Sequence, residues 1–431
     1  MSTGELKARD GRDAAAREAE GHGDLAILGA PPAFDAPLHV GRPNIGDRER
    51  LRARLDDILD RRWLTNGGPC VEELERRIAT LVGVRHVVAM CNATIALEIT
   101  TRALGLSGEV IVPSFTFVAT AHALQWQQIT PVFCDVDPTT HNIDPARVEE
   151  LVTPRTTGIV GVHMWGRPCD VDALEAIAER RGLRLVFDAA HAFGCSRGGR
   201  MVGGFGDAEV FSFHATKFVN AGEGGAVATD DDELAARIRL MRNFGFADYD
   251  RVVYVGTNGK MDEMSAAMGL TSVESMDEFI ARNRANHAAY AAGLRGVPGV
   301  TLVPYDGTER SNFQYVVLEV DEEGAGLSRD ELQRVLHAEN VLARRYFHPG
   351  CHRMEPYRSY FPHAGLLLPN TERLTSRVLS LPTGTAVGED DVGAVCGIIR
   401  RALARAADVR AADVRAAEVR RRIGPPTRNM S

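Results

Sequence analysis

Short apolar segments alternate with helix-forming segments along the middle of this 431-residue chain, and this alternation constrains the fold most strongly. Strands that alternate with helices form βαβ units, and these units build a mainly parallel, doubly wound sheet. Right-handed crossovers then bring the carboxyl ends of the strands to one edge of the sheet. The sequence therefore predicts an α/β fold whose strands are residues 86–91, 109–113, 130–135, 157–162, 185–187 and 210–213.

One of these strands ends in an acidic residue. Asp188 directly follows the continuous apolar run 185–187, which is typical of a strand buried on both faces. An aspartate buried at a strand end needs a cationic partner, and a pyridinium nitrogen is one such partner. An aspartate that caps a helix or forms a turn is the alternative, and the local residues leave both open.

A lysine follows the next strand. Lys217 lies between the apolar strand 210–213 and a glycine-rich turn at 222–225. By position alone it is a solvated lysine just past a strand end. Desolvation, however, lowers a lysine's pKa and makes the neutral amine a nucleophile toward carbonyl groups. Asp188 and Lys217 together favour the chemical interpretation, because pyridoxal phosphate (PLP) enzymes pair a Schiff-base lysine with an aspartate.

Other polar or aromatic residues also follow expected strands. Ala93 and Thr94 begin a helix just after strand 86–91, where free backbone N–H groups and the helix dipole favour an anion, although an ordinary N-cap is the alternative. Phe117 and His163 also come just past strand ends. We therefore expect Phe117, His163, Asp188 and Lys217 to converge on one crevice.

The composition excludes several classes of protein. A net charge of −8 argues against a nucleic-acid partner, because phosphate backbones require a basic surface. The seven cysteines form no CxxC pair, so neither a metal site nor a disulfide framework is expected. No secretory signal and no stretch of about 20 apolar residues is present, so we expect no membrane association and a cytoplasmic location.

Five motifs carry a resemblance to a known family: CNATIAL (91–97), PSFTFVAT (113–120), DAAHAFG (188–194), SFHATK (212–217) and GTNGKMDEMSAAMGL (256–270). On these residues the chain resembles the DegT/DnrJ/StrS sugar aminotransferases, within the fold type I superfamily, over about residues 38–400. WLTNGGP (63–69), GVHMWGRPCD (161–170) and FHPGCH (347–352) are most similar to enzymes that aminate C4 of TDP-4-keto-6-deoxy-D-glucose for antibiotic sugars.

The resemblance implies a fold type I architecture: a mainly parallel, seven-stranded sheet sandwiched by helices, plus a smaller C-terminal α+β domain. We expect a disordered leader (1–24), a large PLP-binding domain (25–275), a small domain (276–405) and an Ala/Arg-rich tail (406–431). PLP is the implied cofactor, with pyridoxamine phosphate as its intermediate form. L-glutamate and a TDP-keto-sugar are the implied substrates.

The resemblance also implies roles for individual residues. Lys217 forms the Schiff base and transfers protons, and Asp188 binds the ring nitrogen. His191 replaces the glutamine of many members, and it either donates to the ring oxygen or stacks. The remaining implied contacts are with the phosphate (Ala93, Thr94, Ser212), the ring face (Phe117), the sugar (His163, Tyr346, His348) and, across a homodimer interface, the partner's cofactor phosphate (Asn258).

Several alternatives remain open. The sequence does not choose between a 4-keto and a 3-keto sugar, and for Tyr346 core packing is an equal alternative. A related dehydratase branch has histidine in place of the Schiff-base lysine, so Lys217 disfavours it. A non-catalytic PLP-binding regulator is disfavoured by the acidic charge and the absence of a helix-turn-helix pattern. A C–C or C–S lyase on the same fold is disfavoured by the sugar-type motifs.

Overall fold

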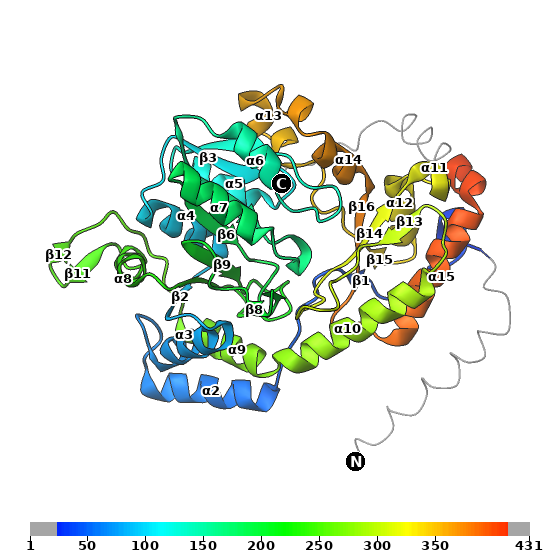
Figure 1. The fold of residues 1–431 in the computed structure, drawn as a ribbon. Helices are drawn as coiled ribbons and strands as arrows, with labels where there is room; N and C mark the ends of the chain where they lie inside the picture. Colours follow the sequence, from blue (N-terminus) through cyan, green and yellow to red (C-terminus); the bar gives the residue numbers. More distant parts are fainter. Residues whose placement is uncertain (1–23, 413–431) are drawn as a thin grey trace, which may run out of the picture.

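The computed structural model of the chain describes residues 24–412 (Figure 1). Nearly all of the expected leader, and the part of the expected tail beyond residue 412, therefore lie outside the described residues. Within the described part, no helix is long and apolar enough to cross a membrane. The same residues contain no group of three or more His, Cys, Asp or Glu side chains that could hold a metal ion.

The largest sheet has seven strands in the order β2-β10-β9-β6-β5-β3-β4. β3, β4, β5, β6 and β9 run parallel to one another, and β10 is antiparallel to both β2 and β9. The prediction of a mainly parallel, seven-stranded sheet is thus confirmed. The strands are β2 (His86–Met90), β3 (Glu109–Pro113), β4 (Thr130–Cys134), β5 (Thr156–Val162), β6 (Arg184–Asp188), β9 (Ala208–Ser212) and β10 (Gly225–Thr229).

Helices cover both faces of this sheet, because its strands are apolar on both sides. In β6, Leu185 and Phe187 pack into one buried cluster, and Val186 packs into the other. The first cluster includes side chains of α2 (Arg48–Arg61), α3 (Pro69–Val82), α6 (Pro145–Leu151), α7 (Val171–Arg181) and α9 (Glu263–Glu274). The second includes α4 (Ala93–Ala103), α5 (Val118–Gln125) and α8 (Asp232–Met241).

Side-chain caps set several helix starts. Asp47, expected as an N-cap, accepts hydrogen bonds from the amides of Glu49 and Arg50. Asn92 caps α4 in the same way by accepting from the amide of Ile95 at 2.8 Å. The expected helix over residues 261–292 is instead two helices, α9 and α10 (Met276–Gly293), separated at Ser275.

A smaller antiparallel sheet follows, with the order β13-β14-β16. Its strands are β13 (Val300–Leu302), β14 (Val316–Val320) and β16 (Val378–Leu381). Together with α10, α12 (Arg329–Ala338) and α15 (Glu389–Ala404) it encloses a third buried cluster, to the right of the main sheet in Figure 1. The sequence also predicts a strand over residues 343–346, but the short strand here, β15 (Val341–Leu342), ends before that segment.

The first described residues pack against this smaller sheet. Leu25 is buried in the third cluster, and β1 (Leu38–His39) pairs with β15 (Val341–Leu342). The predicted division assigned residues 25–39 to the large domain. In the structure Leu25 instead packs in the third cluster, which is formed mainly by residues of the C-terminal part of the chain. The division itself stays a prediction.

The remaining elements connect or extend these layers. The short ones are η1 (Ala26–Leu28), η2 (Met164–Gly166), β7 (Ser196–Arg197), β8 (Arg200–Met201), α11 (Glu322–Ala325), η3 (Cys351–Arg353), α13 (Tyr357–Tyr360), η4 (Ala364–Leu367) and α14 (Pro369–Arg377). β11 (Phe246–Asp248) and β12 (Arg251–Val252) form a hairpin that projects away from the main sheet (Figure 1).

Candidate active site

Lys217 lies in a tight loop between two neighbouring strands. β9 ends at Ser212 and β10 begins at Gly225, which is the register partner of Ser212. Backbone hydrogen bonds from Phe213 to Gly224 (2.8 Å) and from Ala215 to Gly222 (2.7 Å) close the loop between them. The Lys217 Nζ lies 3.3 Å from the Tyr315 hydroxyl. Burial lowers the pKa of Lys217 to about 8, although the carboxylate of Asp188 favours the charged form.

Asp188 lies at the carboxyl end of β6 and is only 6% exposed. Its Oδ2 accepts a hydrogen bond from Thr120 Oγ1 at 2.8 Å, and its Oδ1 accepts from the Ala190 amide at 3.1 Å. Burial raises the pKa of Asp188, while Thr120, Ala190 and the charge of Lys217 act in the opposite direction. Within residues 24–412 no cationic side chain lies within ion-pair distance of it, so a buried carboxylate here has room for a cationic partner.

An aromatic wall, formed by Trp165, His191, Tyr315 and Phe347, stands beside these two groups. The His191 ring lies nearly parallel to the rings of Trp165 (5.9 Å, 17°) and Phe347 (5.8 Å, 15°). Its centroid is 4.5 Å from that of Tyr315, whose hydroxyl contacts Lys217. Burial first, and then the charge of Lys217, hold the pKa of His191 well below its usual value, so this histidine is neutral.

The start of α4 forms an anion cradle. The amides of Ala93 and Thr94 have no hydrogen-bond acceptor among the residues that the structure describes. Gly225 runs so close that a Cβ there would lie 2.6 Å from the Ala93 nitrogen. Because Ser212 pairs with Gly225, the sheet brings Ser212, Ala93 and Thr94 to the same place. Free amides at a helix start are well suited to a phosphate group.

Phe117 and Tyr346 line an adjoining cavity of about 400 Å³. Phe117 is 58% exposed although Phe115, two residues earlier, is fully buried. One side of the Phe117 ring faces Phe347, with centroids 6.2 Å apart. Tyr346 is half-buried against Phe347. The polar part of the lining also includes Gln333, His337, Arg344, Arg345 and His348.

Two predicted site residues make other contacts in this chain, although the backbone amide of His163 donates to the Asp188 carbonyl at 3.1 Å. His163 is fully buried, its Nε2 is 2.8 Å from Glu209 and its Nδ1 accepts from the Cys169 amide at 3.0 Å. A sugar would have to break both bonds, so the predicted sugar contact gains no support from this geometry. Asn258 follows the β11–β12 hairpin and is exposed, and its backbone forms an isolated antiparallel β-bridge with Asn243. Its predicted reach into a partner's site stays a prediction.

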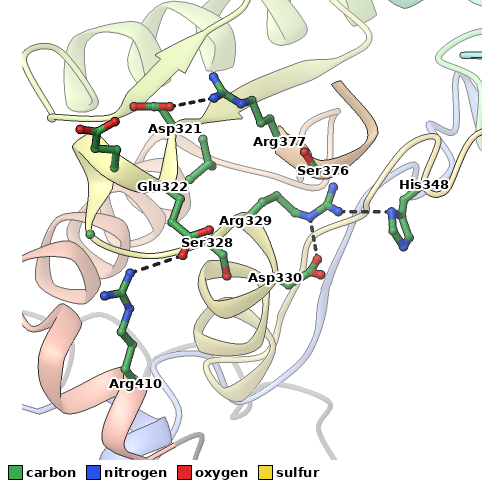
Figure 2. A pocket seen from close by; sticks show the side chains of 12 residues that line it. Asp321, Glu322, Ser328, Arg329, Asp330, His348, Ser376, Arg377 and Arg410 are labelled. Atoms are coloured by element: carbon green, nitrogen blue, oxygen red, sulfur yellow. Dashed lines mark hydrogen bonds and ion pairs between the residues drawn. The ribbon is translucent and has the colours of Figure 1, made fainter. Parts of the chain in front are cut away.

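A larger cavity, of about 770 Å³, is lined by residues of β14, α11, α12 and α14, and neither Asp188 nor Lys217 is among its lining residues (Figure 2). His348 lies on its edge, 3.5 Å from the buried guanidinium of Arg329. Opposite charges already pair within it, as between Arg377 and Asp321 (3.0 Å). Its size therefore does not make it the reaction site, which needs the buried amine and carboxylate at the main sheet.

Sequence reasoning missed four residues of the site. Thr120 was inside a quoted motif, and its spacing of four from Thr116 places both hydroxyls on one side of a helix start, 3.0 Å apart. Trp165 was also inside a quoted motif, but nothing local marks it as a wall residue. Tyr315 and Phe347 come from the C-terminal part of the chain, so only the tertiary fold brings them to Lys217.

Comparison with known proteins agrees with this geometry. The model of the DegT/DnrJ/EryC1/StrS aminotransferase family matches residues 46–400. The chain belongs to this family. It is 37% identical over 368 residues to a dTDP-4-amino-4,6-dideoxy-D-glucose transaminase of Shigella dysenteriae, covering 85% of this chain and 99% of that protein. A transaminase of the same name from Escherichia coli is 35% identical over 362 residues, with coverages of 83% and 96%.

Solved structures of the family are similar as well. The crystal structure of DesI in the presence of its TDP-sugar product matches with a TM-score of 0.87 and 57% identity, covering 90% of this chain and 98% of that chain. DesV of S. venezuelae, in complex with a ketimine intermediate, matches with a TM-score of 0.78 and 32% identity, with coverages of 84% and 99%. The chain is therefore a sugar aminotransferase with a fold type I architecture.

Aminotransferases of this family use PLP, and the residues of the site fit that group. The amine of Lys217 has a lowered pKa, as attack on an aldehyde requires. Among the described residues Asp188 forms no ion pair, so its carboxylate is available to a pyridinium nitrogen. The unpaired amides of Ala93 and Thr94 provide for the phosphate.

Proposed function

We propose that this chain transfers the amino group of L-glutamate to the 4-keto group of a TDP-4-keto-6-deoxyhexose, giving TDP-4-amino-4,6-dideoxy-D-glucose. The observation that carries the chemistry is the partly buried Lys217 amine, whose pKa is lowered, together with the buried carboxylate of Asp188 at the end of a neighbouring strand. The 57% identity to DesI, and the similarity to the dTDP-4-amino-4,6-dideoxy-D-glucose transaminases of Shigella and E. coli, support this substrate.

PLP, when bound, supplies an electron sink and carries the amino group between the two substrates, alternating with its pyridoxamine form. Lys217 moves the proton to and from the donor Cα. With a pKa of about 8, roughly one Lys217 amine in ten is neutral at pH 7, whereas an ordinary lysine is almost entirely charged. Asp188 keeps the ring nitrogen protonated, and Thr120 and Ala190 hold the carboxylate in place.

Further residues bind and orient. The amides of Ala93 and Thr94, with Ser212, hold the phosphate. The exposed face of Phe117 covers the ring, and neutral His191 contributes a donor or a stacking surface. In the 400 Å³ cavity, Arg344 and Arg345 suit the diphosphate of a nucleotide, while Tyr346 and His348 contact the sugar.

We further propose a homodimer in which Asn258 reaches the partner's cofactor phosphate. The β11–β12 hairpin and the residues that follow it expose several large apolar side chains, including Tyr249 (fully exposed), Val252 (57%) and Val255 (72%). Contiguous exposed apolar side chains are typical of an interface. A cytoplasmic place in antibiotic deoxysugar biosynthesis fits the nucleotide-sugar substrate and the seven free cysteines.

The test is incubation of the PLP-loaded protein with L-glutamate and matched 3-keto and 4-keto TDP-sugars. We expect a product whose mass gains an amine only from the 4-keto sugar, with NMR placing the nitrogen at C4. Amination of the 3-keto sugar alone would overturn the regiochemistry, and no reaction of glutamate with the loaded protein would contradict the aminotransferase assignment.

A further inference from the structure

Trp165 has an unusual conformation inside the aromatic wall. It is buried and its backbone lies in the left-handed region (φ 61°, ψ 17°), which a bulky residue rarely adopts. This backbone turns the Trp165 amide toward His191 Nδ1, at 3.3 Å. The indole plane itself lies nearly parallel to His191 and to Phe347 (5.6 Å, 8°). The Trp165 amide therefore contacts the His191 ring nitrogen, and the Trp165 indole lies beside the rings of His191 and Phe347.

The indole N–H of Trp165 is held by a second histidine. Trp165 Nε1 lies 3.1 Å from His141 Nδ1. Because an indole nitrogen can only donate, His141 Nδ1 must accept, and the ring proton of neutral His141 lies on Nε2. That Nε2 is 3.0 Å from Glu319 Oε1, which accepts the proton's hydrogen bond. Glu319 belongs to β14 of the smaller sheet, so two hydrogen bonds join that sheet to the indole.

The same reasoning fixes the tautomer of His191. Its Nδ1 accepts from the Trp165 amide, so in the neutral ring the proton is on Nε2. The backbone of the turn has a separate support, since Asn142 Oδ1 accepts from the Met164 amide (2.9 Å) and Asn142 Nδ2 donates to the Arg167 carbonyl (3.0 Å). The His141–Glu319 pair is thus left to fix the indole plane.

We propose that Glu319 and His141 are positioning residues for the amino transfer: they hold the Trp165 indole, and its plane sets the plane of the His191 ring beside Lys217. The carboxylate matters because it selects the His141 tautomer. If the proton moved to His141 Nδ1, two N–H groups would face each other and the bond to the indole would be lost. The proposal rests on the proposed function only for its kinetic consequence.

The tautomers can be measured on the full chain without any substrate. Selective ¹⁵N labelling of histidine, with signals assigned through His141→Asn and His191→Asn, reports which ring nitrogen is protonated. Asparagine suits position 141, whose φ is 63°. We expect both His141 and His191 to be neutral and protonated at Nε2. We expect Glu319→Ala to change which nitrogen of His141 is protonated and to shift the ¹⁵N signals of His191, whose ring packs on the released indole. Protonation of His141 at Nδ1 in the wild type would overturn the proposal.

A double-mutant cycle then tests the kinetic consequence in the glutamate half-reaction, which needs no sugar. We expect Glu319→Ala to lower its maximal rate about three- to tenfold, the effect of one net hydrogen bond, with little change in glutamate KM. Glu319→Gln keeps an acceptor and should restore most of the rate. In a Trp165→Phe background, which lacks the indole donor, Glu319→Ala should have no further effect.

Additive losses in the cycle would contradict action through the indole. If instead the predicted tautomers and coupling are found but no keto-sugar is aminated, the positioning role stands and only the proposed substrate is wrong. If glutamate does not react at all, the ¹⁵N response of His141 and His191 to Glu319→Ala still decides the proposal in either direction.

Discussion

Adding one methyl group at Gly225 should weaken cofactor binding while the protein still folds. A Cβ at this position would lie 2.6 Å from the Ala93 nitrogen, 2.7 Å from the Asn92 carbonyl carbon and 2.9 Å from the Ala93 Cα. All three are backbone atoms at the start of α4, so no side chain can rotate away. Gly225→Ala must therefore push α4 and β10 apart by several tenths of an ångström.

The short distances from the added Cβ set the expected cost in stability and in PLP affinity. Inserting a methyl group into close-packed structure costs about 1–3 kcal/mol, which a protein of this size is expected to survive. The displaced amides are those proposed to bind the phosphate, and a misplacement approaching 1 Å at a binding site can cost as much as about 100-fold. We expect Gly225→Ala to weaken PLP binding by about 10- to 100-fold while the protein stays folded.

The assay is titration of the apoprotein with PLP, followed by absorbance, with thermal unfolding of the apoprotein measured in parallel. Gly393→Ala is the matched control, because a Cβ there meets nothing within 4 Å and the residue lies in α15. It should bind PLP normally and be slightly more stable, by about 0.5–1 kcal/mol. Wild-type PLP affinity in folded Gly225→Ala would refute the assignment of the phosphate to the start of α4.

The remaining predictions concern the buried amine and carboxylate. Lys217→Ala should abolish the visible absorbance of attached PLP and all turnover with the fold intact, whereas Lys260→Arg should keep the absorbance; turnover by Lys217→Ala would contradict its role. Asp188→Asn should still bind PLP but react at least about 100-fold more slowly in single-turnover experiments, and a near-normal rate would count against the pairing with the ring nitrogen. For the apoprotein, the unfolded lysine keeps its proton up to its usual pKa of 10.5, but folded Lys217 loses it near 8. The free energy of unfolding should therefore rise by up to about 3 kcal/mol between pH 8 and 10.5, with the full cost present below pH 8. Denaturant titrations should show a smaller rise in Lys217→Met, and an unchanged slope would mean that the amine is not desolvated.

Local sequence was enough to predict six strands of the main sheet and its reactive edge, but not the seventh strand, β10. A strand buried on both faces must be apolar at consecutive positions, as 185–187 are, and that run ends in Asp188 wherever the rest of the chain goes. Lys217 follows the next strand for the same local reason. Periodicity was less informative for short elements at the C-terminal end, where the strand expected over 343–346 is absent.

The contacts around these two residues depended on parts of the chain that are far apart. Thr120 reaches Asp188 from 68 positions away, and Tyr315 reaches Lys217 from 98 positions away. Nothing in the residues near Trp165 indicates that its indole donates to His141, or that Glu319 lies behind that histidine. The local sequence was misleading for His163. Its position just past a strand end predicted a side chain open to a crevice, but Glu209 and the Cys169 amide bind its two ring nitrogens.

The sequence by itself thus determined which residues stand at the strand ends, because alternation and apolar runs act over a few residues and fix local backbone direction. Only the tertiary structure decided the protonation and orientation of those residues. A lysine pKa near 8, a carboxylate whose pKa is raised by burial and a histidine held in one tautomer all depend on burial and on hydrogen bonds to distant segments. Desolvation depends on everything that surrounds a group, and that enclosure exists only once the chain has folded.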